Sequence, residues 1–519
     1  MSVYLLVVAC LSSLARGASL GVGADGGAER NASVISVFGS SVADGAFCGG
    51  NCSGSALTNA SDPGGCYQSR LRQYQAAHRG RSVFNNCHGG DSTGKLLARF
   101  AQLLAPNPRF VLIGLSLANE GLIGPDPQRI YDQYAAGLRQ LVDQSRAQGI
   151  EPVVGLCYPN SGYTAAQYGF IKRMNLLVNG FDVPSANFLG AIDDGRGRWV
   201  GGFSANAGHP NAAGSTEMYY ALVPSVWEAI AAGKLPSPRR ADGSQFTTLP
   251  AGPAGPAGPA AALTFAPAAA DTMHSFTLAF GVRCAGCTGD VAAIEAGVGP
   301  PPAPAPPAKC APPDWCAQHG YKPDECNCGV CGSFGGCSFS CTPGDGRVAC
   351  PTNDTDATAA ATAATAAIAA PTRALSIDAA SGGLSYNGGL TRGGAAKVNG
   401  IKVNDGAWHA VVLTHYWCNG STALYVDGGL VSQHSERLVP TSLALVGGSR
   451  SGGAPVDFQD LLVYRAGLNA DEVAFLRANK TNVLQASLEV YAPLSADGVT
   501  ENRAQSMSVI THTTTHTIA

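Results

Sequence analysis

One short stretch near the N-terminus constrains the fold most, because it joins an apolar, β-branched run to a glycine and two serines. Val34–Phe38 has the composition of a strand buried on both faces, and Gly39, Ser40 and Ser41 follow it directly. Open α/β sheets place their ligand crevices at the carboxyl ends of such strands. Ser41 is therefore a candidate nucleophile at that edge. A simple turn between strand and helix uses the same residue types, so the assignment depends on residues further along the chain.

Apolar runs of strand length alternate with amphipathic segments from Val34 to Ala232. The runs expected to form strands are Val34–Phe38, Ser82–Asn85, Phe110–Leu115, Val153–Cys157 and Ala186–Ile192. Two intervening segments each place apolar residues on one helical face, the first with Leu96, Leu97, Phe100, Leu103 and Leu104, the second with Ile130, Tyr134, Leu138, Leu141 and Val142. Strands and helices in alternation imply a parallel sheet with right-handed crossovers.

The length of 519 residues exceeds that of a single ordinary core, so more than one domain is expected. The alternating region, residues 33–232, makes the first domain. A linker at residues 233–261 follows, because its Pro-Ala-Gly triplets favour an extended spacer. Charged residues make up 13% of the chain and the net charge is −3. No basic stripe is present, so a nucleic-acid partner is not expected.

Residues 262–490 carry a different pattern, which favours antiparallel β structure. The expected strands are Phe276–Phe280, Leu375–Asp378, Trp408–Thr414, Ala423–Asp427, Leu443–Gly447 and Phe458–Tyr464, with a short helix near Asp471–Ala478. A Pro-rich, Cys-rich and Ala/Thr-rich insertion interrupts this region at about residues 288–372. The tail at residues 497–519 has little apolar pattern and is expected to be disordered.

The first seventeen residues are expected to form a signal peptide cleaved before Ala18, because an apolar run ends in Ala15-Arg16-Gly17. A membrane anchor is the alternative, but the run is shorter than the roughly 20 residues that span a bilayer. No later segment is expected to span a membrane. Sequons that would carry glycans in a secreted protein start at Asn31, Asn51, Asn59, Asn353, Asn419 and Asn479.

Cysteine usage supports an extracellular location. The chain has 17 cysteines, and those left after removal of Cys10 with the signal peptide are even in number and could all pair. Cys284/Cys287 and Cys328/Cys331 have the spacing of zinc ligands. In a secreted chain disulfides are favoured over zinc, so no metal site is expected.

Ser41 needs a base and an oxyanion hole before it can act as a nucleophile. His209, in Gly208-His209-Pro210-Asn211, lies just before an expected helix late in the first domain and is the best base. Gly90 follows the second expected strand, where its backbone N–H can point into the crevice. Asn119 follows the third and offers a side-chain amide. Candidate groups thus fall at the ends of successive elements.

In order and spacing, Gly39-Ser40-Ser41, Gly90, Asn119 and His209 resemble the four sequence blocks of the SGNH/GDSL hydrolase family over about residues 33–230. The resemblance implies a flavodoxin-like α/β/α fold that hydrolyses esters without a cofactor or a metal. It also implies that Ser41 is the nucleophile and His209 the general base. The oxyanion hole would consist of the backbone N–H of Ser41 with Gly90 and Asn119.

Two positions depart from the family pattern. Ser40 stands where the family usually has Asp, which is tolerable because that side chain is not the nucleophile. Asn206 stands where the family supplies the Asp of the catalytic triad. An amide can orient His209 but adds no charge, and in serine proteases the Asp-to-Asn change costs about 10⁴ in rate. A Ser–His dyad oriented by a backbone carbonyl would escape this loss, and Asp193 and Asp194 are possible substitutes.

The second domain resembles a laminin-G-like, concanavalin A-like jelly roll over about residues 262–490. Its matching motifs are Asp405–His409, Ala423–Gly428, Phe458–Tyr464 and Leu468–Val473. Most of these residues are core strands and turns, so Trp408 is expected in the core rather than as a sugar-stacking platform. The resemblance implies a module that binds a glycan or a matrix protein.

Together these features predict a secreted serine ester hydrolase, an esterase or deacetylase of an acylated carbohydrate or another small ester, with a glycan- or protein-binding module. One alternative is a catalytically degenerate SGNH scaffold that acts as a binding protein, which Asn206 favours. Another is a structural extracellular glycoprotein, which the Pro-rich and Ala/Thr-rich tracts favour.

Overall fold

The computed structural model describes residues 29–48, 66–235, 238, 240, 245–250, 261–268, 270–298, 372–388, 390–391, 401–447, 454–479, 483–495 and 498–514. Several predictions lie outside these residues. They concern the signal peptide, the Pro-Ala-Gly triplets, the sequons at Asn51, Asn59 and Asn353, and the cysteines from Cys310 to Cys350.

The N-terminal region is built on a parallel sheet with the strand order β2-β1-β3-β4-β5. Its strands are β1 (Asn31–Gly39), β2 (Ser82–Asn85), β3 (Pro108–Gly114), β4 (Glu151–Gly155) and β5 (Ser185–Ala186). The predicted parallel sheet is confirmed. Its central strands are apolar along their whole length because both faces are covered by helices.

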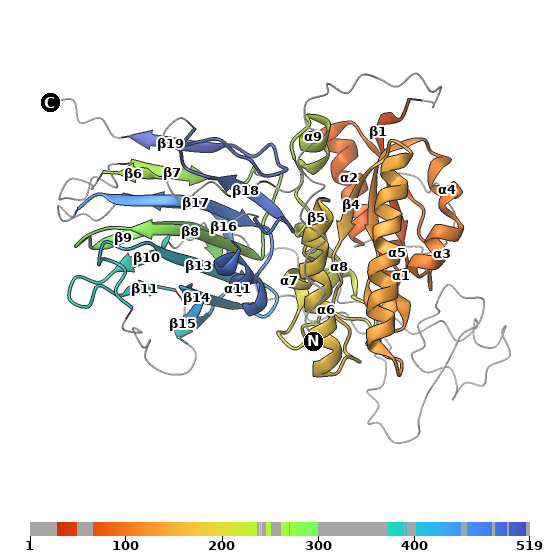
Figure 1. Cartoon of the computed structure of the whole chain (residues 1–519), viewed down its shortest axis with the longest axis horizontal. Coiled ribbons are helices and arrows are strands. Elements are labelled where there is room, and N and C mark those ends of the chain that lie inside the picture. The colour runs from red at the N-terminus through yellow and green to blue at the C-terminus, as the bar shows by residue number, and fades with distance from the viewer. Residues whose placement is uncertain are drawn as a thin grey trace, which may run out of the picture.

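Helices cover the two faces of this sheet, as Figure 1 shows. One face packs against α3 (Thr93–Ala98), α4 (Phe100–Leu104), α5 (Pro127–Ala147) and α6 (Ala165–Val178). The other packs against α2 (Tyr67–Arg79), α7 (Phe188–Ile192), α8 (Ala212–Tyr220) and α9 (Val226–Ala231). The short elements are α1 (Ser41–Asp44), η1 (Leu117–Glu120) and η2 (Asn179–Phe181). In β3, Val111 and Ile113 face the first layer while Phe110 and Leu112 face the second, as the two-residue period of a strand requires.

The fifth predicted strand, Ala186–Ile192, is wrong beyond its first residue. The structure has only the two-residue β5 and then the helix α7. The side chain of Asn187 starts that helix by accepting a hydrogen bond from the Gly190 N–H at 2.9 Å. All residues of α7 are buried, so no amphipathic period distinguished a helix from a strand.

The C-terminal region consists of two antiparallel sheets that enclose one apolar core. The first, in the order β11-β10-β9-β16-β7-β19, contains β7 (Ala261–Phe265), β9 (Gly289–Val298), β10 (Thr372–Ile377), β11 (Leu384–Tyr386), β16 (Leu438–Val446) and β19 (Ile510–Thr514). The second, in the order β12-β15-β14-β13-β8-β17-β18, contains β8 (Phe276–Arg283), β12 (Leu390–Thr391), β13 (His409–Tyr416), β14 (Ser421–Val426), β15 (Gly429–Ser435), β17 (Val456–Tyr464) and β18 (Leu488–Ala492), and β6 (Thr247–Leu249) pairs with β17. The helix α11 (Ala470–Ala478) follows β17. The antiparallel β structure predicted for this region is confirmed, and its assignment as a jelly roll stays a prediction.

Two predicted boundaries in this region need correction. Residues Gly289–Val298, assigned to the insertion, form β9 at the centre of the first sheet. The tail expected to be disordered contains β19, which pairs with β7 along Ile510–Thr514. Both strands are rich in Ala, Gly or Thr, so their hydrophobic period is weak, and it is pairing with an existing sheet that orders them.

The predicted core position of Trp408 is also wrong. Its ring is only half-buried and lies edge-on to Phe246 at 6.0 Å between ring centroids. The guanidinium of Arg283 lies 4.7 Å from the Trp408 ring centroid. Trp408 thus lies directly before the core strand β13 in sequence but packs against a cation at the surface.

The cysteines of the described residues follow the disulfide prediction only in part. Cys284 and Cys287 form a disulfide, which favours that alternative over zinc at this pair. Cys87, Cys157 and Cys418 are buried thiols instead, so the expectation that all the remaining cysteines pair is wrong for these three. Each lies in an apolar cluster, where a thiol behaves as a small hydrophobic group.

The two regions are joined by a polar seam along β5, the edge of the parallel sheet. The Ser487 N–H donates to the Ser185 carbonyl at 2.8 Å, and the Asn187 N–H donates to Ser487 Oγ at 2.6 Å. The buried guanidinium of Arg465 donates to the carbonyls of Tyr220 and Thr272. Figure 1 shows the two regions side by side at this seam. A segment of the β region therefore covers an edge that would otherwise expose unpaired backbone groups.

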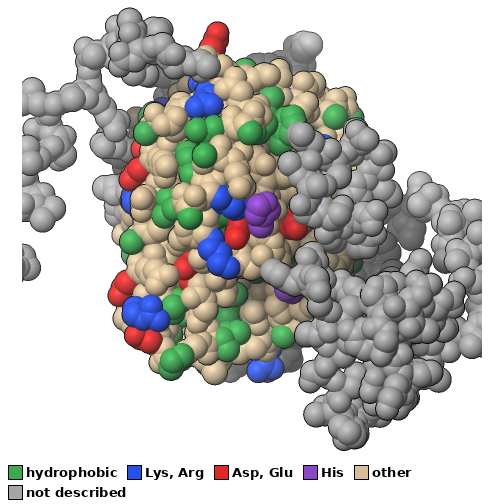
Figure 2. Space-filling view, turned by 90° about the vertical axis from the view of Figure 1, so that its right-hand side faces the viewer, with side chains coloured by type: hydrophobic (Ala, Val, Ile, Leu, Met, Phe, Trp, Pro, Cys, Tyr) green, Lys and Arg blue, Asp and Glu red, His purple; other side chains and the backbone are tan. Residues whose placement is uncertain are grey.

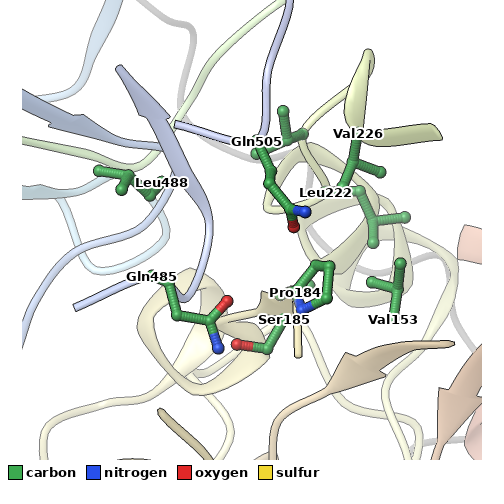
Figure 3. A pocket seen from close by; sticks show the side chains of 10 residues that line it. Val153, Pro184, Ser185, Leu222, Val226, Gln485, Leu488 and Gln505 are labelled. Atoms are coloured by element: carbon green, nitrogen blue, oxygen red, sulfur yellow. The ribbon is translucent and has the colours of Figure 1, made fainter. Parts of the chain in front are cut away.

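A small cavity lies in the seam, lined by residues of both regions that include Val153, Ser185, Leu222, Gln485 and Gln505 (Figure 3). Its volume is ≈ 20 Å³. That volume holds about one water molecule, so this cavity is too small to be the substrate site.

Figure 2 shows the end of the α/β region, where charged side chains of both signs are scattered among apolar and neutral ones. Within the described residues, no helix combines the length and the hydropathy needed to cross a bilayer.

Candidate active site

Ser41 lies at the carboxyl edge of the parallel sheet, at the first position of α1. The end of β1 lies very close to the end of β3. A Cβ added to Gly39 would lie only 2.3 Å from the Gly114 carbonyl oxygen, so only glycine fits at this position. The Ser40 N–H donates to that same carbonyl at 3.2 Å. This contact turns the chain sharply out of the sheet and leaves the Ser41 side chain partly exposed while Ser40 is buried.

His209 meets Ser41 across the crevice. Its Nε2 lies 2.8 Å from Ser41 Oγ. Its Nδ1 lies 3.0 Å from Asn206 Oδ1. The structure therefore brings together three of the residues predicted from the sequence, although 168 residues separate Ser41 from His209.

The backbone of Gly208 settles which atom of the Asn206 amide faces the imidazole. The Gly208 N–H donates to Asn206 Oδ1 at 2.9 Å, so the atom in this position is the carbonyl oxygen. Since that oxygen can only accept, His209 Nδ1 carries a proton and donates. Nε2 is then the unprotonated nitrogen in neutral His209, and Ser41 Oγ donates to it.

The loop that carries Asn206 and His209 is held by residues far from it in sequence. The Trp199 indole Nε1–H donates to the Ala207 carbonyl at 2.9 Å, and the Ser161 N–H donates to the same carbonyl at 2.8 Å. After the loop, Asn211 caps α8 by accepting from the Gly214 N–H at 3.0 Å. His209 is thus fixed between a braced loop and a capped helix.

Asp193 and Asp194 do not replace the missing carboxylate. Asp193 is buried and accepts hydrogen bonds from the Tyr168 hydroxyl and the Gly197 N–H. Burial raises the pKa of Asp193 to about 7. Asp194 accepts from the N–H groups of Arg196 and Arg198. Both carboxylates therefore stabilise the loop before the histidine, while the imidazole nitrogens are occupied by Ser41 and Asn206.

Burial lowers the pKa of His209 below its usual value. Among the residues that the structure describes, no carboxylate is bonded to the ring to oppose this effect. The Phe47 ring, 4.7 Å away between centroids, covers the imidazole. Phe47 adopts a positive φ of 67°, a conformation that its residue type does not signal, so it could not be identified from the sequence.

Asn119 and Gly90 occupy the ends of the neighbouring strands. Asn119 Oδ1 accepts from the Ser116 N–H at 2.9 Å and from the Tyr158 hydroxyl at 3.2 Å, so its NH₂ group is turned to the opposite side. Gly90 has a φ of 77°, which an L side chain rarely adopts. No described residue accepts a hydrogen bond from the Gly90 N–H. Their roles as oxyanion donors stay predictions.

No group of three or more His, Cys, Asp or Glu side chains suited to a metal ion occurs among the residues that the structure describes. The groups that the structure places at this edge of the sheet are a serine, a histidine and hydrogen-bond donors. This combination, on a parallel α/β/α scaffold, is typical of serine hydrolases.

The comparisons with known proteins agree with that class for the N-terminal domain. Residues 37–216 match the model of the GDSL-like Lipase/Acylhydrolase family. The N-terminal domain is thus SGNH-like. The match does not include the C-terminal β region. No curated protein sequence matches the chain significantly.

Solved structures align with the chain at low TM-scores. An acetylxylan esterase from Geobacillus stearothermophilus is 15% identical, with a TM-score of 0.30, and the alignment covers 36% of this chain and 91% of that one. An alpha/beta hydrolase enzyme from the metagenome of Lake Arreo, Spain, is 19% identical, with a TM-score of 0.30, over 36% of this chain and 92% of that one. We draw no argument from these two similarities.

Proposed function

We propose that the N-terminal domain is a serine ester hydrolase that uses Ser41, His209 and Asn206 as a triad. The observation that carries the proposal is the orientation of the Asn206 amide. The Gly208 N–H directs its oxygen toward His209 Nδ1. The amide oxygen therefore selects the same His209 tautomer, protonated at Nδ1, that an Asp would select. The wrong His tautomer, which makes Asp-to-Asn variants of serine proteases slow, is avoided.

The reaction follows from this arrangement. His209 Nε2 takes the proton of Ser41 Oγ as the oxygen attacks the ester carbonyl. The negative oxygen of the tetrahedral intermediate is stabilised by the Ser41 N–H, the Gly90 N–H and the Asn119 amide. The imidazolium then gives its proton to the departing alkoxide. Water, deprotonated by His209, hydrolyses the acyl–Ser41 ester and restores the enzyme.

The amide partner of His209 Nδ1 sets the expected strength of the catalyst. The Asn206 amide orients the imidazole but contributes only a dipole toward the imidazolium that forms in the transition state. We therefore expect a weak esterase. The proposed substrate is a small ester or an acylated carbohydrate, and the proposed second module binds a glycan or a matrix protein.

The experiment is hydrolysis of p-nitrophenyl acetate by the purified full chain. Turnover that Ser41→Ala abolishes, with an unchanged circular dichroism spectrum, supports the enzyme. Ser40→Ala is the matched control and keeps its activity, because Ser40 is buried beside the nucleophile and its hydroxyl has no described partner. Turnover equal in wild type and Ser41→Ala, or none in wild type, would favour the alternative of a non-catalytic SGNH scaffold.

The proposed extracellular location rests on the N-terminal sequence, the sequons and the cysteines. Three sequon asparagines are described and accessible, since Asn31 is exposed and Asn419 and Asn479 are half-buried. Mass spectrometry of the protein secreted from a eukaryotic host should give a mature chain that starts at Ala18. An intact Met1 would contradict secretion by signal-peptide cleavage.

A further inference from the structure

Tyr158 lies three residues beyond the end of β4, which is next to the strand that delivers Asn119. Its side chain is 3% exposed. Its hydroxyl donates a hydrogen bond to Asn119 Oδ1 at 3.2 Å. Tyr158 was not among the residues predicted from the sequence, because a tyrosine after an apolar run is expected to be core.

The Ser116 N–H makes the role of this hydroxyl specific. It donates to the same Asn119 oxygen at 2.9 Å. A backbone N–H can only donate, so the oxygen of the Asn119 amide must lie on this side and its NH₂ group on the other. With two donors on one oxygen, the amide has little freedom to rotate about its Cβ–Cγ bond. With the Ser116 N–H as the single donor, it would rotate more freely.

Burial raises the pKa of Tyr158 well above its usual value. The hydroxyl therefore keeps its proton and remains a donor throughout the pH range in which His209 can act as a base.

The ring of Tyr158 makes a second connection. It stacks on Trp199, with centroids 5.8 Å apart and an interplanar angle of 26°. The Trp199 indole in turn holds the Ala207 carbonyl in the loop of Asn206 and His209. One side chain thus contacts both the oxyanion side and, through Trp199, the base side of the site.

We propose that Tyr158 is a positioning residue that aims the Asn119 amide at the oxyanion of the tetrahedral intermediate. The proposal rests on the proposed ester hydrolysis. It assigns the tyrosine hydroxyl, and not only its ring, a part in lowering the barrier of acyl transfer. Because an oxyanion donor acts on the transition state more than on the bound ester, the effect belongs in kcat rather than in KM.

The test is a double-mutant cycle of Tyr158→Phe and Asn119→Ala, with p-nitrophenyl acetate as substrate. Tyr158→Phe keeps the ring on Trp199 and removes only the hydroxyl. We expect it to lower kcat by about 10-fold, less than the loss of about 10²–10³ for removal of an oxyanion donor itself. In the Asn119→Ala background the same change should have no further effect, because the amide that it aims is gone.

Tyr464→Phe is the matched control. Tyr464 is fully buried in β17, and its hydroxyl has no hydrogen-bond partner among the described residues. Deleting it should leave kcat unchanged. Values of kcat are normalised to the fraction of chains that a fluorophosphonate labels at completion, so that loss of folded protein is not counted as loss of catalysis.

Three outcomes overturn the proposal. They are an unchanged kcat in Tyr158→Phe, an equal loss in both backgrounds, and a loss confined to KM. Failure of the proposed function is recognised separately, because turnover is then absent in wild type or persists in Ser41→Ala. In that case Tyr158 has no oxyanion to serve and the positioning role falls with it.

Discussion

The α/β region and the β region each hold a histidine with both ring nitrogens occupied, and the two differ in their partners. His209 contacts the Ser41 hydroxyl and the Asn206 amide. His409, in β13, contacts the carboxylates of Asp427 at 2.9 Å and Asp405 at 3.1 Å. One ring is held by neutral groups and the other by two negative charges.

The partners move the two pKa values in opposite directions. Burial lowers the pKa of His209. Burial also opposes the charge of His409, but hydrogen bonds and charges from Asp427 and Asp405 outweigh it and raise the pKa. A base must be neutral before it takes a proton, whereas an ion pair is strongest with a charged ring. The comparison indicates that His209 suits catalysis and that His409 suits the stability of the β region.

The largest expected difference between the two histidines is in activity. His209→Ala should lower kcat/KM by about 10⁴-fold or more, since loss of the base disables the whole triad. His409→Ala should leave kcat/KM unchanged and lower the midpoint of thermal unfolding instead, because it leaves two carboxylates without their partner. Both variants are compared by ester hydrolysis and by circular dichroism melting. Equal activity losses in the two variants would break the comparison.

A smaller effect is expected when the neutral partner of His209 is given a charge. Asn206→Asp should raise kcat/KM by about 10-fold, because a carboxylate stabilises the imidazolium. Asn206 is exposed, so solvent screens the charge and the gain stays below the full effect of a buried triad aspartate.

Asn206→Ala completes that test. It should lower kcat/KM, because the Gly208-directed oxygen that selects the tautomer is removed. A fully active Asn206→Ala enzyme, together with a neutral Asn206→Asp, would contradict the triad and favour a dyad with another orienting group.

The smallest expected effects are in the pH dependence of kcat/KM, which reports on His209, and in the pH dependence of stability, which reports on His409. Because the pKa of His209 is lowered, its neutral form persists below pH 6.5, and kcat/KM should fall only as pH drops through that lowered value. Asn206→Asp should move this acidic limb upward. A limb unmoved by this change would show that Asn206 is not the electrostatic neighbour of the base.

For His409 the sign is reversed. A pKa raised on folding contributes stability that is fully present below the unfolded value near pH 6.5 and is lost as pH rises through the folded value. The difference in unfolding free energy between wild type and His409→Gln should therefore shrink as pH increases through that window. Denaturant unfolding at several pH values measures it, and a difference that grows with pH would contradict the ion pair.

Sequence patterns predicted those elements that have a clear apolar run or a clear apolar face, and they failed for elements that have neither. The continuous apolar run of β3 and the apolar face of α5 were sufficient to place those elements, since β3 is a short β-branched run between helical segments and α5 is long and strongly periodic. The buried segment Phe188–Ile192 was not, because residues buried on all sides carry no period. In the β region, β9 and β19 were missed since their Ala- and Thr-rich sequences acquire a strand conformation only by pairing with neighbours.

For the site, the sequence alone determined that Ser41, Gly90, Asn119 and His209 follow successive elements of an alternating pattern. Connection rules of parallel sheets then imply that they meet at one edge. Only the tertiary structure decided how the hydrogen bonds at that edge are oriented. The Gly208 N–H selects the oxygen of Asn206, and the Ser116 N–H and Tyr158 hydroxyl select that of Asn119. The oxygen and the nitrogen of an Asn amide belong to the same residue, so the sequence does not tell which of them faces the site. The hydrogen-bond donors that the fold places around the amide decide this.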